Sequence, residues 1–108
     1  MDKQIIKKRF NYIHNGKATI CIIVFKLSRE MRDEIDNQYL WNKFKIPYDG
    51  VLTVKGISKC QDGDEYDKEW GEAIARNRAM AKMYARLNKI NMAISVYYNK
   101  KALLFAPH

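Results

Sequence analysis

An Asn-Gly pair followed by six consecutive apolar residues constrains the fold of this sequence more than any other feature. Asn15-Gly16 separates the segment 10–13 from the apolar run Ile20–Phe25. Asn and Gly best tolerate the two positive φ angles of a type I′ turn, so the pair predicts a β-hairpin. A strand that is apolar on consecutive residues is typical of burial on both faces. We therefore expect the second strand of the hairpin to be central in a sheet and covered on both sides.

Two helices and a further strand are predicted after the hairpin. Ser28 is a suitable N-cap, and apolar residues follow it at helical spacing, which predicts a short polar helix. The segment Val51–Ile57 returns to strand character. A long helix is expected over 67–88, capped by Asp64 or Asp67. Spacings of three or four residues predict its apolar face, which consists of Trp70, Ala73, Ile74, Asn77, Met80, Ala81, Tyr84 and Leu87.

The segment after this helix fits either a strand or more helix. Met92–Tyr98 is rich in β-branched and aromatic residues, 99–101 has the composition of a turn, and Ala102–Phe105 would form a last short strand. Continuation of the helix through Ser95 is the alternative. The predicted fold is thus α+β, with an antiparallel sheet formed by the N-terminal hairpin, the middle strand and the C-terminal strands. The sheet packs against one long helix, with a short additional helix.

Length and composition set further limits. A chain of 108 residues can bury one core but not two, so a single domain over residues 1–108 is expected. Two cysteines are too few for a disulfide framework or a four-thiolate metal site, which favours a reduced, cytoplasmic protein. The first 17 residues lack the apolar stretch of a signal peptide, and the longest apolar run is too short to span a bilayer. We therefore expect no membrane partner.

The formal net charge of +8 is unevenly distributed. Six of the twelve acidic residues lie within residues 61–72, where Lys68 is the only base, so this window carries −5 and the other 96 residues carry +13. A domain this basic outside one acidic segment attracts polyanions, and the plainest such partner is a phosphate backbone.

Two groups of basic residues are candidates for binding such a partner. The helix ridge consists of Arg78, Lys82, Arg86 and Lys89. Its members recur about one helical turn apart, roughly 5.4 Å, which is near the spacing of successive phosphates. The N-terminal cluster consists of Lys3, Lys7, Lys8 and Arg9, of which the last three are the binding candidates. The alternatives are a solvated helix face for the ridge and, for the cluster, a basic edge strand that discourages aggregation.

Aromatic residues gather in the segment 39–48 and offer a second kind of binding surface. They are Tyr39, Trp41, Phe44 and Tyr48. Their irregular spacing favours closure of the core or docking on a partner, with Tyr39, Trp41 and Tyr48 as the docking candidates. Base stacking is the third alternative, but no run of aromatics on adjacent strands supports it.

The sequence carries no recognisable catalytic constellation. It shows no zinc-ligand spacing, no phosphate-binding glycine loop and no nucleotide fingerprint, so we expect no catalytic residues, no metal site and no cofactor. A magnesium-dependent nuclease built on Asp62, Asp64 and Asp67 is a remote alternative, because capping and turn formation already account for these carboxylates.

Three short motifs lie close together in the middle of the chain. They are Gly56-Ile57-Ser58-Lys59-Cys60, Asp64-Glu65-Tyr66-Asp67 and Gly71-Glu72-Ala73-Ile74-Ala75-Arg76-Asn77-Arg78-Ala79. Together they resemble a loose family of small phage and prophage proteins that share Gly-x-(Ala/Ser)-x-Cys, Asp-x-(Phe/Tyr)-Asp and Gly-x-x-(Ile/Leu)-Ala-x-x-Arg-Ala. The match covers residues 56–79, which is 24 of 108. The resemblance implies a strand-turn-helix unit, similar to the sheet-plus-helix arrangement of double-stranded-RNA-binding-like folds.

The resemblance also implies a role. Small phage proteins without catalytic motifs commonly act by occupying a surface on host machinery. We therefore expect a non-enzymatic phage-type protein that docks on host nucleic-acid machinery in the host cytoplasm, with an anti-defence or anti-CRISPR-like inhibitor as one concrete form. Its partner would be a host nucleoprotein or a nucleic acid. The alternative is direct, weakly sequence-selective binding of DNA or RNA.

Overall fold

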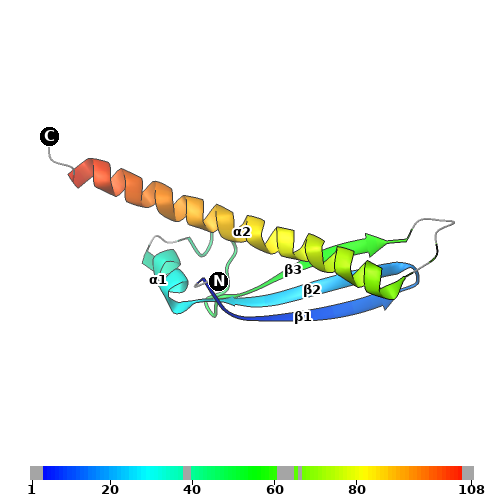
Figure 1. Ribbon diagram of the computed structural model, residues 1–108. Coiled ribbons are helices and arrows are strands. Elements are labelled where there is room, and N and C mark those ends of the chain that lie inside the picture. The colour runs from blue at the N-terminus through cyan, green and yellow to red at the C-terminus, as the bar shows by residue number, and fades with distance from the viewer. Residues whose placement is uncertain (1–3, 38–39, 61–64, 66, 106–108) are drawn as a thin grey trace.

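The chain forms a three-stranded antiparallel sheet with two helices. The computed structural model describes residues 4–37, 40–60, 65 and 67–105, and for 96–105 the backbone alone. The elements in chain order are β1 (Ile5–Asn15), β2 (Ala18–Leu27), α1 (Arg29–Asn37), β3 (Val51–Lys59) and α2 (Lys68–Phe105). The strand order is β1-β2-β3, and α2 lies across one side of the sheet (Figure 1). The predicted α+β class is confirmed.

The predicted hairpin is present, although its turn lies one residue later than expected. Asn15 pairs with Ala18, so Gly16 and Lys17 form the two-residue loop. Gly16 has a φ of 61°, and the described residues include no positive φ at Asn15 or Lys17. A positive φ at the first loop position alone is the pattern of a type II′ turn. Glycine is sufficient for that position, so Asn15 stays extended and adds a pair to the ladder.

β2 is the central strand, as predicted, but it is covered on one face only. Its side chains alternate between buried and half-buried along the whole strand. Cys21, Ile23 and Phe25 are buried on the side of α2. Ile20 and Ile22 face the other way and remain half-buried, and no helix in the described part of the chain covers them. We call this second side of the sheet the open face.

Small residues bring α2 into close contact with β3. Gly71, Ala75 and Ala79 are buried and recur four residues apart, which places them on one helix face. They approach β3 at Gly56, where an added Cβ would overlap the carbonyl oxygen of Ala75 and the amide nitrogen of Ala79. A side chain at residue 56 would therefore push the helix away from the sheet.

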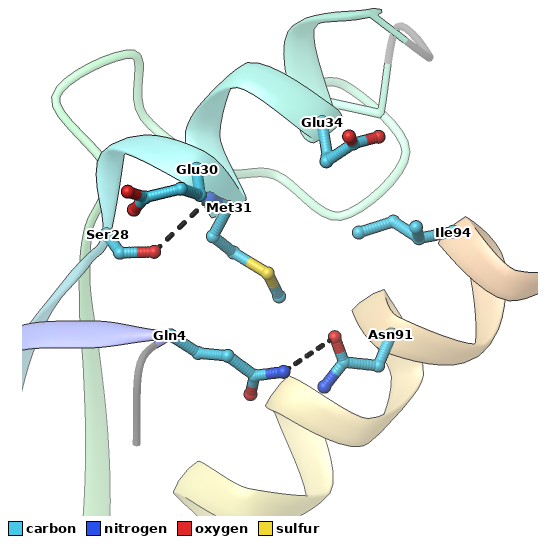
Figure 2. Close-up of a pocket in the computed structure, with 7 residues that line it drawn as sticks. All are labelled: Gln4, Ser28, Glu30, Met31, Glu34, Asn91 and Ile94. Carbon is cyan, nitrogen blue, oxygen red and sulfur yellow. Dashed lines mark hydrogen bonds between the residues drawn. The ribbon is translucent and has the colours of Figure 1, made fainter. Parts of the chain in front are cut away.

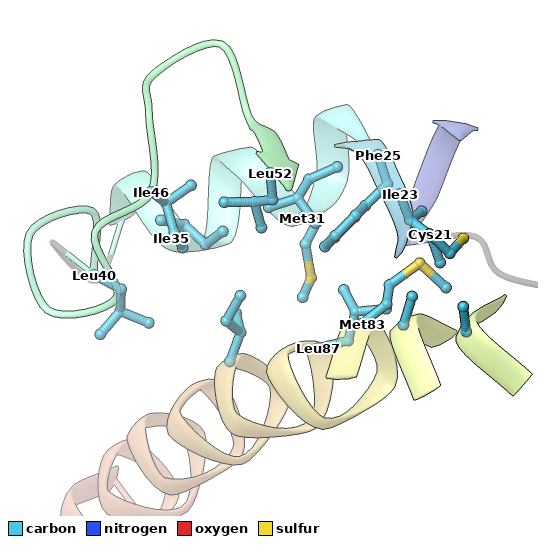
Figure 3. Packing of buried hydrophobic residues seen from close by; sticks show 14 residues of the cluster. Cys21, Ile23, Phe25, Met31, Ile35, Leu40, Ile46, Leu52, Met83 and Leu87 are labelled. Carbon is cyan, nitrogen blue, oxygen red and sulfur yellow. The ribbon is translucent and has the colours of Figure 1, made fainter. Parts of the chain in front are cut away.

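Larger side chains fill the space where α2 moves away from the strands. Met83, Leu87 and Ile90 continue the buried helix face toward the C-terminus. They meet Phe25 and Leu52 of the sheet, and Met31, Ile35, Leu40 and Ile46 from α1 and the segment that follows it (Figure 3). The core is thus thin beside the hairpin turn and thick beside α1, which agrees with the divergence of α2 from the sheet in Figure 1.

The apolar face predicted for the long helix was wrong except at Leu87, which is buried, and Met80, which is partly buried against the core. Trp70 is 66% exposed and Tyr84 is 41% exposed, because the side of the helix that faces the sheet carries Gly and Ala instead. A prediction from hydrophobic periodicity assigns large apolar residues to the buried face of a helix. A close contact between a helix and a sheet instead requires small residues on that face. The predicted N-caps of both helices are present. Ser28 Oγ accepts a hydrogen bond from the Met31 amide at 3.2 Å, and Asp67 Oδ1 accepts one from the Trp70 amide at 3.2 Å.

The predicted C-terminal strands were also wrong. α2 runs without interruption from Lys68 to Phe105, so the alternative of continued helix holds and extends past Ser95. The physical reason is that 91–94 still pack on the core: Ile94 and Ala93 contact it, and Asn91 accepts a hydrogen bond from Gln4. β-branched and aromatic composition is a weak preference that such tertiary contacts override.

Replacing Gly56 by Ala should destabilise the protein by about 2–3 kcal/mol, because the new methyl group overlaps helix backbone that cannot rotate away. Gly16→Ala is the matched control. It makes the same chemical change where no atom lies within 4 Å, so only the positive φ opposes it, at about 1 kcal/mol. Urea unfolding followed by circular dichroism measures both. Equal losses for the two variants would contradict the close contact between α2 and β3.

Candidate functional site

The open face gathers five basic side chains. They are Lys7 and Arg9 on β1, Lys26 on β2, and Lys55 and Lys59 on β3. The ladder register and the alternation of a strand place all five on the side opposite α2. The three strands lie wholly within the described residues and contain no Asp or Glu. The strands therefore contribute positive charge and no acidic group to this face.

Three of these cations surround one hollow. Lys7 and Lys26 are directly opposite each other in the β1–β2 ladder, and Arg9 follows Lys7 on the same face. With Val24, Phe25 and Val51 they line a hollow of about 250 Å³. Like charges opposite each other destabilise a sheet by a few tenths to about 1 kcal/mol, so this arrangement is unfavourable unless an anion is bound. Among the described residues, none of the three forms an ion pair.

This three-cation hollow has the chemistry of an anion site. Arg presents a planar fork of N–H donors that matches phosphate oxygens, and the two Lys side chains add compact positive charges. The apolar floor formed by Val24 and Val51 contributes no competing acceptor side chain. A phosphate group is therefore a ligand that this geometry can bind by charge and by hydrogen bonding together.

The helix ridge is partly used for holding the fold together. Arg78 donates a hydrogen bond from Nη1 to the carbonyl oxygen of Ile57 at 2.6 Å, which ties α2 to β3. Arg86 is half-buried and donates from Nη2 to the carbonyl oxygen of Phe44 at 3.0 Å. Lys82 and Lys89 are exposed. Binding by the ridge stays a prediction, and two of its four members already have backbone partners.

The N-terminal cluster is divided between the two sides of the sheet, apart from Lys3, which lies outside the described residues. Lys7 and Arg9 lie on the open face, whereas Lys8 alternates to the other side, where its Nζ lies 6.0 Å from the ring centroid of Phe10. Three basic residues of the open face were not predicted as binding residues from the sequence: Lys26, Lys55 and Lys59. The signal was available: the strand period of two, once the hairpin turn fixes the register, aligns them with Lys7 and Arg9.

The aromatic segment contributes to the core and also exposes one ring. Leu40 and Ile46 are buried, and Trp41 is half-buried with its Nε1 donating to Asp36 at 3.0 Å. The rings of Trp41 and Tyr48 are 5.2 Å apart, and Tyr48 is 79% exposed. Tyr39 lies outside the described residues. Docking through Trp41 and Tyr48 stays a prediction.

A second hollow lies at the same end of the sheet, on the side of α2, between α1 and α2 (Figure 2). Its residues include Gln4 and Asn91, which are joined by a 2.9 Å hydrogen bond, and the side chain of Met31 points into it. Glu30 and Glu34 supply the charge at this site. Because that charge is negative, this hollow repels the anions that the three-cation hollow attracts.

Nucleophilic and metal-binding groups are few in the described part of the chain. Burial raises the pKa of the Cys21 thiol, opposed by a hydrogen bond with Tyr12 and by the charge of Arg76, so the thiol stays protonated near neutral pH. No group of three or more His, Cys, Asp or Glu among the described residues could hold a metal. Asp67 caps α2, while Asp62 and Asp64 of the expected alternative lie outside those residues. None of the described helices combines the length and apolar character that a membrane crossing requires.

No family model, curated protein or solved structure matches this chain. A function therefore has to be argued from the residues themselves. The open face is the candidate site because it combines concentrated charge, a hollow and the lack of a covering helix among the described elements.

Arg86→Ala should lower the free energy of unfolding by about 1–2 kcal/mol, because it leaves the Phe44 carbonyl without its charged donor. Lys82→Ala, one turn earlier on the same helix, removes the same charge from an exposed position and should stay within about 0.5 kcal/mol of the wild type. Thermal or urea unfolding compares the two. If both variants were as stable as the wild type, Arg86 would be available to a ligand after all.

Proposed function

We propose that this protein is a non-enzymatic binding protein whose open face binds nucleic acid through its phosphates. The observation that carries the proposal is the placement of five basic side chains, from three strands that contain no acidic residue, on a sheet face that no described helix covers. Such a surface raises the local concentration of a polyanion and releases its counterions on binding.

The setting that we propose for this activity is host nucleic-acid machinery, encountered by a phage-type protein. The support is the resemblance of residues 56–79 to small phage and prophage proteins. In that setting the bound nucleic acid would be free or part of a host nucleoprotein, and an anti-defence inhibitor is one form that such binding would take. Tyr48 is exposed and would be available for a protein component of the same partner.

The experiment that tests the proposal is the salt dependence of binding to a fluorescently labelled nucleic acid. If all five cations contact phosphates, the logarithm of the association constant should fall with the logarithm of salt concentration with a slope between about −4 and −5. Replacing Lys7, Arg9 and Lys26 together by Gln should reduce the magnitude of this slope by roughly 2 to 3. The affinity should fall with it at low salt.

The matched control replaces three basic residues away from the open face. Lys8, Lys82 and Lys89 are exposed, and changing them to Gln removes the same total charge. This variant should keep most of the slope, because none of its sites lies on the open face. The reverse result, a loss of slope in the control and none in the open-face variant, would move the interface to the helix ridge and reject the proposal.

A further inference from the structure

The open face lacks the side chains on which unpaired bases stack. The strands carry three aromatic residues, Phe10, Tyr12 and Phe25, and the register places all of them on the side of α2. In their place the open face presents Ile20, Ile22 and Val24 along its centre, joined in one cross-strand row by Ile13 and Ile57. Proteins that bind single strands rely on base-aromatic stacking, worth about 1–3 kcal/mol per base.

The cations are spread along the length of the strands. Lys7, Arg9 and Lys26 surround the hollow at one end, and Lys59 pairs with Ala18 at the other end, with Lys55 between them. Lys26 and Ala18 are eight residues apart on β2, which corresponds to about 26 Å at the rise of a strand. The backbone ladder fixes the order and spacing of the residues that carry these charges before any ligand arrives.

A fixed arrangement of charges favours a ligand whose own charges are fixed. A duplex holds its phosphates in place over tens of base pairs, so it loses little conformational freedom on a rigid sheet. A single strand has to be ordered along the face, and without aromatic stacking less there offsets that loss than in proteins that bind single strands. The isoleucine row between Lys55 and Lys59 offers contact to sugars while reading no base edge.

We propose that the ligand of the open face is double-stranded nucleic acid, held by its backbone with little sequence preference. This inference rests on the proposed function and narrows it to one class of nucleic acid. The three-cation hollow binds a phosphate at one end of the contact, Lys59 binds a phosphate at the other end, and Lys55 binds one between them.

The test compares a labelled strand of about 20 nucleotides, chosen not to pair with itself, with the duplex that it forms with its complement. Fluorescence anisotropy at one fixed salt concentration measures both, for DNA and for RNA. The duplex should bind at least about tenfold more tightly than the strand, the difference that the lack of a single stacked base would produce. The DNA and RNA arms show which duplex is preferred.

A designed gain of stacking provides a second measurement. Ile22→Phe places a ring at the centre of the open face, between Asn11 and Lys55 in the ladder. It should raise the affinity for the single strand several-fold, while the duplex gains nothing. The preference for the duplex should therefore shrink in this variant, and circular dichroism establishes that the fold is retained.

The outcomes separate the two proposals. Equal or tighter binding of the single strand by the wild type, lost in the Lys7, Arg9 and Lys26 variant, would overturn the duplex inference and leave nucleic-acid binding in place. An unchanged preference in Ile22→Phe would also overturn it, because missing stacking would then not set the preference. No binding of either ligand at low salt would overturn both.

Discussion

The contact between α2 and β3 at Gly56 determines how the rest of the molecule is arranged. A helix whose backbone touches a strand has its position fixed at that point, and Gly71, Ala75 and Ala79 extend the contact along two turns. From there α2 crosses the sheet over β3 and β2 and leaves room beside α1 for larger side chains. Because one helix occupies one side, the opposite side of a three-stranded sheet stays open. The candidate site is thus a consequence of where the helix can pack.

Charge follows the same division. The described acidic residues lie in α1, at Asp49 just before β3, and around the start of α2, where Asp67 caps the helix and Glu72 contacts His14 Nε2 at 3.2 Å. After Glu72 the chain contains no further acidic residue, and the strands contain none. Carboxylates therefore cap a helix, as at Asp67, or join two elements, as at Glu72. The strands carry positive charge and no carboxylate. The net charge of +8 understates this separation.

Local features of the fold could be predicted from the sequence, and features set by packing could not. The hairpin, the caps at Ser28 and Asp67 and the class of the fold depend on residues close in sequence, and all were confirmed. The buried face of α2 depends on how near the helix comes to β3. The small residue Ala75 is therefore buried, whereas the large apolar residue Trp70 is exposed. The strand-like composition after Asn91 gave way to helix because the preceding turns are anchored to the core.

The basic residues illustrate why a count of charges identifies a surface poorly. Arg78 and Arg86 have the spacing of a phosphate-binding ridge. Each nevertheless donates a hydrogen bond from its guanidinium to a backbone carbonyl of this same chain. Lys26, Lys55 and Lys59 show no spacing pattern until the register places them beside Lys7 and Arg9. A charge used to hold two elements together is not available to a ligand without a loss of stability, whereas a charge opposed only by another like charge is stabilised when an anion arrives. That difference in free energy, rather than the number of bases, makes the open face the better anion site.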